Sequence, residues 1–266
     1  MKSLLHQVLE PWRKRDRIFQ VNIVKEFLQE VILHYLSRKG YGRYLTFEGG
    51  TCLRFVYGLR RFSEDLDFSM REETDIEGLI SGIKKELELQ GYEVEVKKGG
   101  KGNVKRYFYK FPGLLHYCNI PSQKEEKVSV LLEIDTNPPW GGRIEETLLN
   151  RNFLFTVIHY DLPALMAKKI HAILFRGFEK GRDYYDLLWL LTKDITPDID
   201  LLNNACKQTS PDFSLITPKN WKRLLADHLE KKDMRKIKMD VLPFLEIPED
   251  ADLLVKEIFM KLLREI

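Results

Sequence analysis

The sequence predicts an α+β protein in which a lobe that contains strands is followed by an all-helical lobe. Near the N-terminus, apolar residues recur at helical intervals. Between about residues 44 and 160, short segments alternate apolar and polar residues as strands do, and after residue 162 the helical spacing returns. Strands grouped apart from helices are typical of α+β proteins. We therefore expect two joined lobes, comprising residues 1–160 and 161–266.

The elements follow from the same periodicities, taken in chain order. The segment from about Leu4 to Arg38 is expected to be helical up to Lys39–Gly42, where glycine permits the turn that closes a helix. Shorter helices are expected at 52–57 and 75–90. Strands are expected at 44–47, 65–69, 92–98, 104–111, 127–135 and 152–160. The helices of the second lobe are expected at 162–175, 182–191, 199–207, 220–229 and 251–263.

Composition and charge exclude several classes of protein. The 266 residues carry 43 Lys and Arg against 40 Asp and Glu, and a net charge of +3 does not by itself indicate nucleic-acid binding. The longest uncharged stretch, Phe111–Gln123, is shorter than the ~20 apolar residues of a membrane helix, so we expect no span. The N-terminal apolar run is too short for a signal peptide, and the three cysteines lack metal-type spacing. A reducing, cytoplasmic location is the expectation.

Two aspartates on one predicted strand are the first candidates for chemistry. Asp65 and Asp67 project from the same strand face with Cα atoms ~7 Å apart. Carboxylates so placed can bind a pair of divalent ions such as Mg²⁺, an arrangement used in nucleotidyl transfer. The alternative is a solvated polar face. Gly49-Gly50-Thr51, between a predicted strand and a predicted helix, favours the metal site, because N–H groups at a helix start bind phosphate.

A second carboxylate pair lies on the predicted strand at 127–135. Glu133 and Asp135 share one face of that strand, and either could complete the metal site. The alternative is an exposed polar face, but Leu131 lies on the same side, so that face is not uniformly polar. We favour one of the two as a metal ligand, with Asp135 preferred over Glu133.

The predicted helices of the second lobe contain a lysine pair and an aspartate pair. A partly buried lysine near carboxylates can neutralise triphosphate charge, and Lys169 is a candidate for that role. Asp183 and Asp186 are three residues apart and therefore share one helix face. From the residues alone, a solvated lysine face and a structural ion pair or helix cap are the preferred explanations.

Four segments together resemble the AbiEii/AbiGii toxin family of nucleotidyltransferases, which includes the MenT-type toxins. These segments are Glu48–Phe68, Leu132–Pro139, Ala167–Ala172 and Arg182–Leu187, in the order found in the family. The resemblance implies a DNA polymerase β-like mixed sheet with flanking helices, followed by a helical lobe. It also implies a toxin of a toxin–antitoxin or phage-defence system, with a DNA-binding antitoxin encoded by a neighbouring gene.

The resemblance also implies roles for individual residues. The residues implied to bind the nucleotide are Gly49, Gly50, Thr51, Ser63 and Lys169. Asp65 and Asp67 would bind metal, Asp183 would match the aspartate of the last motif, and Lys169 would match the essential lysine, with Lys168 as its rival. The chain has Gly-Gly-Thr where polymerase β-like enzymes carry Gly-Ser, but threonine can replace serine as a hydroxyl donor.

A basic segment from 97 to 110 suggests what the protein acts on. The candidate RNA-binding residues are Lys97, Lys98, Lys101, Lys105 and Arg106, and Tyr107, Phe108 and Tyr109 interleave with them. Cations with aromatic platforms suit a single-stranded RNA end, although a solvated hairpin would look the same. Some members of the family resemble tRNA-modifying enzymes, so we expect Mg²⁺- or Mn²⁺-dependent transfer of a nucleotide from an NTP to a tRNA 3′ end. The alternatives are nucleotidylation or phosphorylation of a protein, or a non-catalytic nucleotide-binding partner.

Overall fold

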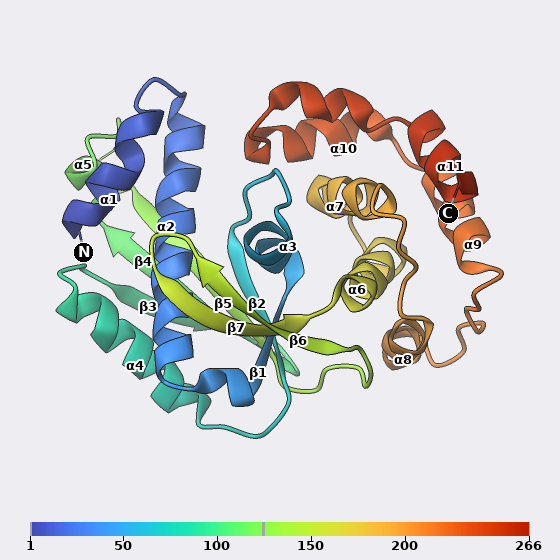
Figure 1. The fold of residues 1–266 in the computed structure, drawn as a ribbon, viewed down its shortest axis with the longest axis horizontal. Helices are drawn as coiled ribbons and strands as arrows, with labels where there is room; N and C mark the ends of the chain where they lie inside the picture. The colour runs from blue at the N-terminus through green and yellow to red at the C-terminus, as the bar shows by residue number, and fades with distance from the viewer. Residues whose placement is uncertain (1, 124–125, 266) are drawn as a thin grey trace. The chain divides into compact units, whose positions relative to one another are not determined.

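The computed structural model describes residues 2–123 and 126–265 and contains helices around one sheet, followed by helices alone (Figure 1). The strands are β1 Leu45–Glu48, β2 Asp65–Met70, β3 Glu95–Gly99, β4 Val104–Pro112, β5 Lys127–Asp135, β6 Ile144–Asn150 and β7 Leu154–Tyr160. The helices before β7 are α1 Lys2–Leu9, α2 Arg17–Arg38, α3 Gly49–Tyr57, α4 Ile76–Leu89 and α5 Leu114–Tyr117. Those after it are α6 Leu162–Phe175, α7 Gly181–Leu191, α8 Ile199–Thr209, α9 Trp221–Glu230, α10 Met234–Val241 and α11 Lys256–Glu265.

The sheet has seven strands in the order β3-β4-β5-β2-β1-β7-β6. It is mixed, because β2 pairs with β1 antiparallel and with β5 parallel, and β1 pairs with β7 parallel. The expectation of an α+β fold with a mixed sheet, flanking helices and a helical C-terminal region is confirmed.

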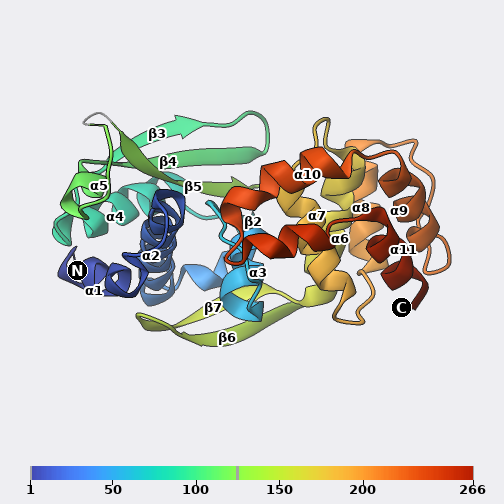
Figure 2. The ribbon, with the colours of Figure 1, turned by 90° about the horizontal axis from the view of Figure 1, so that it is seen from above.

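The pleat of the strands gives the sheet one apolar and one polar face. The apolar side chains of β5, at Val128, Val130, Leu132 and Ile134, are all buried. Helices α2 and α4 pack on this face, where the Tyr109 hydroxyl of β4 donates to the Ile80 carbonyl of α4 at 3.2 Å (Figure 2). The opposite face carries the acidic residues of β2 and β5, because alternate side chains of a strand point to opposite sides.

The chain divides into two compact units. The sheet unit comprises the residues up to Val56, Phe62–Asn137 and Glu146–His159, and the helical unit comprises Tyr57–Arg61, Pro138–Glu145 and the residues from Tyr160 onward. The helical unit is therefore not continuous in the sequence. No helix in the described part of the chain is long and apolar enough to cross a membrane.

Several elements differ from their prediction. Helix α5 was not predicted, and the helix expected at 251–263 begins only at Lys256, after a 3-10 turn at Pro248–Leu253. The predicted helix at 4–38 is two helices, because Pro11 lies in a 3-10 turn between them and Asp16 caps α2 by accepting from the Phe19 N–H at 3.0 Å. Strand β6 was not predicted, because this edge strand is largely exposed and its apolar and polar residues, Ile-Glu-Glu-Thr-Leu-Leu-Asn, do not alternate. Helix α10 was not predicted either, because its basic residues obscured the apolar pair Ile237 and Val241.

The three cysteines, Cys52, Cys118 and Cys206, are buried free thiols. Burial raises the pKa of Cys118 and of Cys206 to about 11 and that of Cys52 well above its usual value. Only the thiolate reacts readily with disulfide reagents. We therefore expect no reaction with Ellman's reagent at pH 8 in the native protein and full reaction of all three thiols in 8 M urea, measured at 412 nm. Rapid labelling of the native protein would contradict the buried placement.

Candidate active site

Strand β2 places Asp65 and Asp67 half-buried on the polar face of the sheet. The parallel register with β5 pairs Asp67 with Glu133 and pairs Ser69 with Asp135. Glu133 therefore lies on the same row across the sheet as Asp67, whereas Asp135 lies one pair further along. The sequence favoured Asp135 as the third metal ligand. The register instead favours Glu133, because Glu133 is the one that lies beside Asp67.

Glu48 is a further carboxylate on this row that the sequence analysis did not identify. It ends β1 and is the antiparallel partner of Asp67, so Glu48, Asp67 and Glu133 form one row over three adjacent strands. The Ser69 hydroxyl donates to the Glu48 Oε2 at 2.8 Å. The position of Glu48 directly before Gly49 could have identified it from the sequence. It was missed because the strand predicted at 44–47 ended one residue before it. We call Glu48, Asp65, Asp67, Glu133 and Asp135 the carboxylate face.

Glu133 and Asp135 also have nearby partners. Glu133 forms an ion pair with Arg106 of β4, whose side chain is about half exposed. An Asp135 oxygen accepts from the backbone N–H of Asn137 at 3.0 Å. Glu133 is thus partly neutralised by a cation, and Asp135 also stabilises the turn that ends β5.

Helix α3 begins at Gly49, directly after β1, so the glycines form the first turn of the helix and not a loop before it. Gly49 has a φ of +76°, which favours glycine. A Cβ at this position would lie 2.0 Å from the Asp67 Oδ2. The backbone at Gly49, the first residue of α3, therefore directly contacts the carboxylate of β2.

We expect Gly49→Ala to lower nucleotide binding at least about tenfold, because the new methyl group displaces the Asp67 carboxylate. Gly58→Ala is the matched control, since Gly58 has a φ of +78° and open space around its Cβ. Both variants carry the ~1–2 kcal/mol cost of a left-handed alanine, measured by urea unfolding. Equal nucleotide affinities for the two variants would show that the contact with Asp67 does not matter.

The other predicted phosphate-binding residues have structural partners. The buried Thr51 hydroxyl donates to the backbone carbonyl of Asp65, which ties α3 to β2. The carbonyl of Ser63, also buried, accepts from the Gln29 side chain at 2.9 Å. The backbone N–H groups of Gly49, Gly50 and Thr51 and the hydroxyl of Ser63 stay the candidates for phosphate contact.

The donor chemistry of the carboxylate face suits a hard divalent cation. All its side-chain donors are carboxylate oxygens, which Mg²⁺ and Mn²⁺ prefer. Within residues 2–123 and 126–265, no three His, Cys, Asp or Glu side chains gather closely enough to hold a metal ion. Mg²⁺ commonly binds through one or two carboxylates, with water and substrate phosphates completing its shell. The residues present therefore fit a Mg²⁺ that binds together with a nucleotide.

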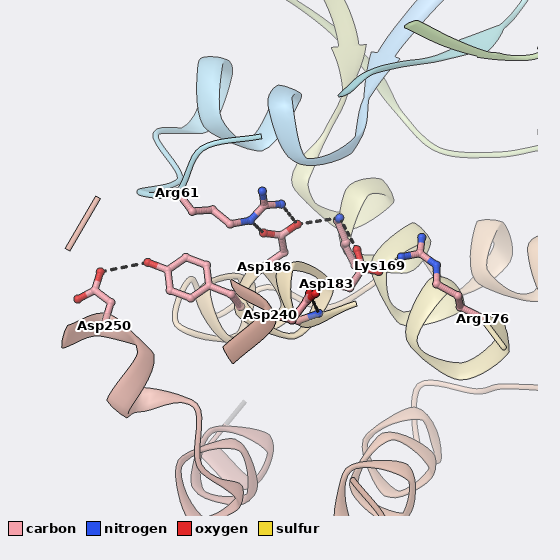
Figure 3. A network of polar contacts seen from close by, with 9 residues as sticks. Arg61, Lys169, Arg176, Asp183, Asp186, Asp240 and Asp250 are labelled. Carbon is pink, nitrogen blue, oxygen red and sulfur yellow. Dashed lines mark hydrogen bonds and ion pairs between the residues drawn. The ribbon is translucent and has the colours of Figure 1, made fainter. Parts of the chain in front are cut away.

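A second charged group lies in the helical unit, where Lys169 of α6 meets α7 (Figure 3). The Lys169 Nζ lies 2.9 Å from Asp183 Oδ1 and 2.7 Å from Asp186 Oδ2. The Nζ of Lys168 instead lies 5.0 Å from the centre of the Tyr160 ring. Of the two adjacent lysines, Lys169 is thus the one held between carboxylates.

Two arginines complete this group, which we call the lysine cluster: Lys169, Asp183, Asp186, Arg61 and Arg176. Arg176 Nη1 lies 2.5 Å from Asp183 Oδ2, and Arg61 binds Asp186 through both Nε and Nη2. Burial opposes charge on Asp183, but Lys169 and Arg176 outweigh it and lower the pKa of Asp183 to about 2. Burial likewise opposes charge on Lys169, but Asp183 and Asp186 outweigh it and raise the pKa of Lys169.

The basic segment at 97–110 forms the β3–β4 hairpin and is only partly available for binding. Lys98 forms an ion pair with Glu77, and the Lys105 ammonium donates to the Gly102 carbonyl at 3.1 Å. Lys97 and Lys101 are exposed.

The expected aromatic platforms of this hairpin are mostly absent from its surface. Tyr107 and Tyr109 are buried on the apolar face, so the expectation that they stack with bases is wrong. Phe108 is half-buried, and its register with Leu131 and Lys97 places it on the same side of the sheet as the carboxylate face.

Comparison with known proteins identifies the family. Residues 31–256, a range that includes the carboxylate face and the lysine cluster, match the family model described as "Nucleotidyl transferase AbiEii toxin, Type IV TA system". The chain is therefore a nucleotidyltransferase of the toxin class. It belongs to the AbiEii family of type IV toxin–antitoxin systems, which implies a nucleotide substrate and an antitoxin partner.

Solved structures show the same fold at low sequence identity. The chain is similar to JHP933 from Helicobacter pylori, with a TM-score of 0.53 and 19% identity over 92% of each chain. It is also similar to a putative nucleotidyltransferase from H. pylori, with a TM-score of 0.53 and 19% identity over 91% of this chain and 95% of that one. Among curated protein sequences, none matches the chain.

Proposed function

We propose that this AbiEii-family toxin uses a divalent metal ion to transfer a nucleotide from an NTP to the 3′ hydroxyl of a tRNA, with release of pyrophosphate. The observation that carries the proposal is the contact between the α3 helix start and the carboxylate face. The backbone at Gly49 approaches Asp67 so closely that no side chain fits between them. A phosphate bound by the helix-start N–H groups would then lie next to the carboxylates that suit a metal ion.

The residues divide into those that hold the metal and those that hold the nucleotide. Asp65 and Asp67, with Glu133 or Asp135, would hold Mg²⁺ or Mn²⁺, which when bound polarises phosphate oxygens and the acceptor hydroxyl. The N–H groups of Gly49, Gly50 and Thr51 would bind phosphate at the start of α3.

The lysine cluster would supply positive charge for the reaction. Lys169 would offset the negative charge that develops on the transferred phosphate. An ammonium has three N–H donors, and after Asp183 and Asp186 one remains for a phosphate oxygen. Asp183 would orient Lys169 through the hydrogen bond between them.

A small group of side chains supports an RNA acceptor. Lys97 and Arg106 are exposed, and the register places both on the same side of the sheet as the carboxylate face, with Phe108 between them. Cations and one aromatic ring suit the phosphates and the unstacked bases of a single-stranded end. Lys98, which is paired with Glu77, and Lys105 occupy the opposite side of the hairpin and are weaker candidates.

The proposal is tested by incubating the purified protein with Mg²⁺, each α-labelled NTP in turn, total tRNA and a bacterial protein extract. We expect label at tRNA 3′ ends, lost when EDTA is added. Label in protein bands alone would favour nucleotidylation of a protein, and binding without transfer would favour a non-catalytic partner. Either outcome would contradict the proposed RNA acceptor.

The toxin assignment leads to a test in cells. We propose that the antitoxin is a DNA-binding protein encoded by the neighbouring gene. Expression of the toxin in a bacterial host is expected to arrest growth, and either Asp65→Ala or co-expression of the neighbouring gene is expected to relieve the arrest. Arrest that persists with Asp65→Ala would show that toxicity does not come from nucleotidyl transfer.

A further inference from the structure

The lysine cluster contains an arginine–aspartate pair that the proposed mechanism does not use. Arg61 donates from Nε to the Asp186 Oδ1 at 2.5 Å and from Nη2 to Oδ2 at 2.6 Å. The same Oδ2 lies 2.7 Å from the Lys169 Nζ. One carboxylate oxygen is thus shared between a guanidinium and the ammonium (Figure 3).

The pair is fully removed from solvent. Arg61 is 1% exposed and Asp186 is 0% exposed. Burying two charges is costly unless they are paired, and replacing such a pair by apolar residues is often neutral or stabilising. Stability alone therefore does not require charged residues here, and an arginine keeps its charge at any physiological pH.

The charges of the lysine cluster do not balance. Three cations, Arg61, Lys169 and Arg176, surround two carboxylates, Asp183 and Asp186, which leaves one net positive charge. Without Arg61, the two carboxylates would fully offset Lys169 and Arg176. Arg61 therefore decides whether the group as a whole is cationic or neutral.

The next ring of charged groups does not change this balance. Asp240 accepts from the Gly181 N–H at 2.6 Å, and Asp250 accepts from the Tyr185 hydroxyl at 3.1 Å. Because these donors are neutral, the two carboxylates add two negative charges. Lys180 and Arg182, at the start of α7, add two positive charges that offset them.

We propose that Arg61 and Asp186 are positioning residues for Lys169, an inference that rests on the proposed function. Asp186 holds the ammonium in place together with Asp183. Arg61 binds the same carboxylate, so that Asp186 orients Lys169 without neutralising the cluster. The cluster then presents one net positive charge to a polyphosphate, which is the chemical group shared by every nucleoside triphosphate.

A charge series tests this inference with inorganic tripolyphosphate and with each NTP as ligands in calorimetry. Arg61→Gln makes the cluster neutral and is expected to weaken binding about 10- to 100-fold. Asp186→Asn removes a negative charge, which raises the net charge of the cluster, and it is expected to tighten binding about tenfold. Transfer at saturating NTP is nevertheless expected to fall about 10- to 100-fold, because Lys169 loses one of its two anchors. The double variant restores the net charge, so its Kd is expected within about threefold of wild type.

Two control variants separate this role from a merely structural one. Asp252→Asn makes the same change in charge on a side chain that is 87% exposed, and its Kd is expected to change less than about twofold. Arg61→Lys keeps the charge but loses the bidentate contact, and it replaces Arg61→Gln if the latter fails to fold. Its Kd is then expected within about threefold of wild type, and a larger loss of affinity would count against the charge argument.

Several outcomes would overturn the inference. Kd values that shift in the same direction for Arg61→Gln and Asp186→Asn, or that stay constant across the series, would show a purely structural pair. A wild-type protein that binds neither tripolyphosphate nor any NTP would also overturn it. Binding that follows the charge series without transfer of label would instead contradict the proposed function and leave the positioning role supported.

Discussion

Replacing Asp186 by alanine is expected to lower the free energy of unfolding by about 3–5 kcal/mol. The variant leaves the guanidinium of Arg61 buried without its carboxylate, and an unpaired buried charge is strongly destabilising. It also removes one of the two anchors of Lys169. Urea unfolding followed by circular dichroism measures the change.

The matched control for this prediction is Asp252→Ala. Asp252 faces solvent and lies 3.6 Å from Lys238, so its loss is expected to change stability by less than about 1 kcal/mol. A double replacement, Arg61→Met with Asp186→Leu, removes both charges and is expected to be closer to wild type than Asp186→Ala. If Asp186→Ala cost no more than Asp252→Ala, the buried guanidinium of Arg61 would not depend on its carboxylate partner.

Asp67→Asn is expected to lower nucleotide transfer by at least about 1000-fold, which corresponds to about 4 kcal/mol of transition-state stabilisation. The substitution keeps the shape of the side chain and removes its charge. Asp67 lies at the centre of the row formed with Glu48 and Glu133 and beside the start of α3. The initial rate of label transfer to tRNA, at saturating Mg²⁺ and NTP, measures the effect.

The same assay decides which carboxylate acts with Asp65 and Asp67. The register places Glu133 beside Asp67, so Glu133→Gln is expected to lower transfer at least about tenfold and more than Asp135→Asn does. Unfolding free energies of all three variants show whether a loss of rate reflects a loss of fold. Transfer by Asp67→Asn at more than a tenth of the wild-type rate would refute the proposed metal site.

Local periodicity correctly predicted the elements in which apolar residues recur at regular spacing. Strand β5 was expected at 127–135 and is found there, because its buried and half-buried residues alternate along its length. Helix α6 likewise begins and ends where its spacing predicted. Strand β6 was missed because the apolar burial that creates a periodic signal is nearly absent from this edge strand.

The candidate site was predictable where its parts are close in sequence. The pleat puts Asp65 and Asp67 on one face regardless of the rest of the fold. Glu48 could not be found in the same way, because its place beside Asp67 depends on the antiparallel register of β1 and β2. The contact that explains Gly49 joins residues from two elements and is invisible in either segment alone.

The sequence by itself determined the fold class, the two aspartates of β2 and the resemblance to a toxin family. These depend on short-range periodicity and on motifs, which are properties of neighbouring residues. Only the tertiary structure decided that Lys169 and not Lys168 lies between Asp183 and Asp186, and that Arg61 shares the second of these carboxylates. Such choices follow from which distant side chains are buried together, because a buried charge must find a partner and the chain order does not say which one.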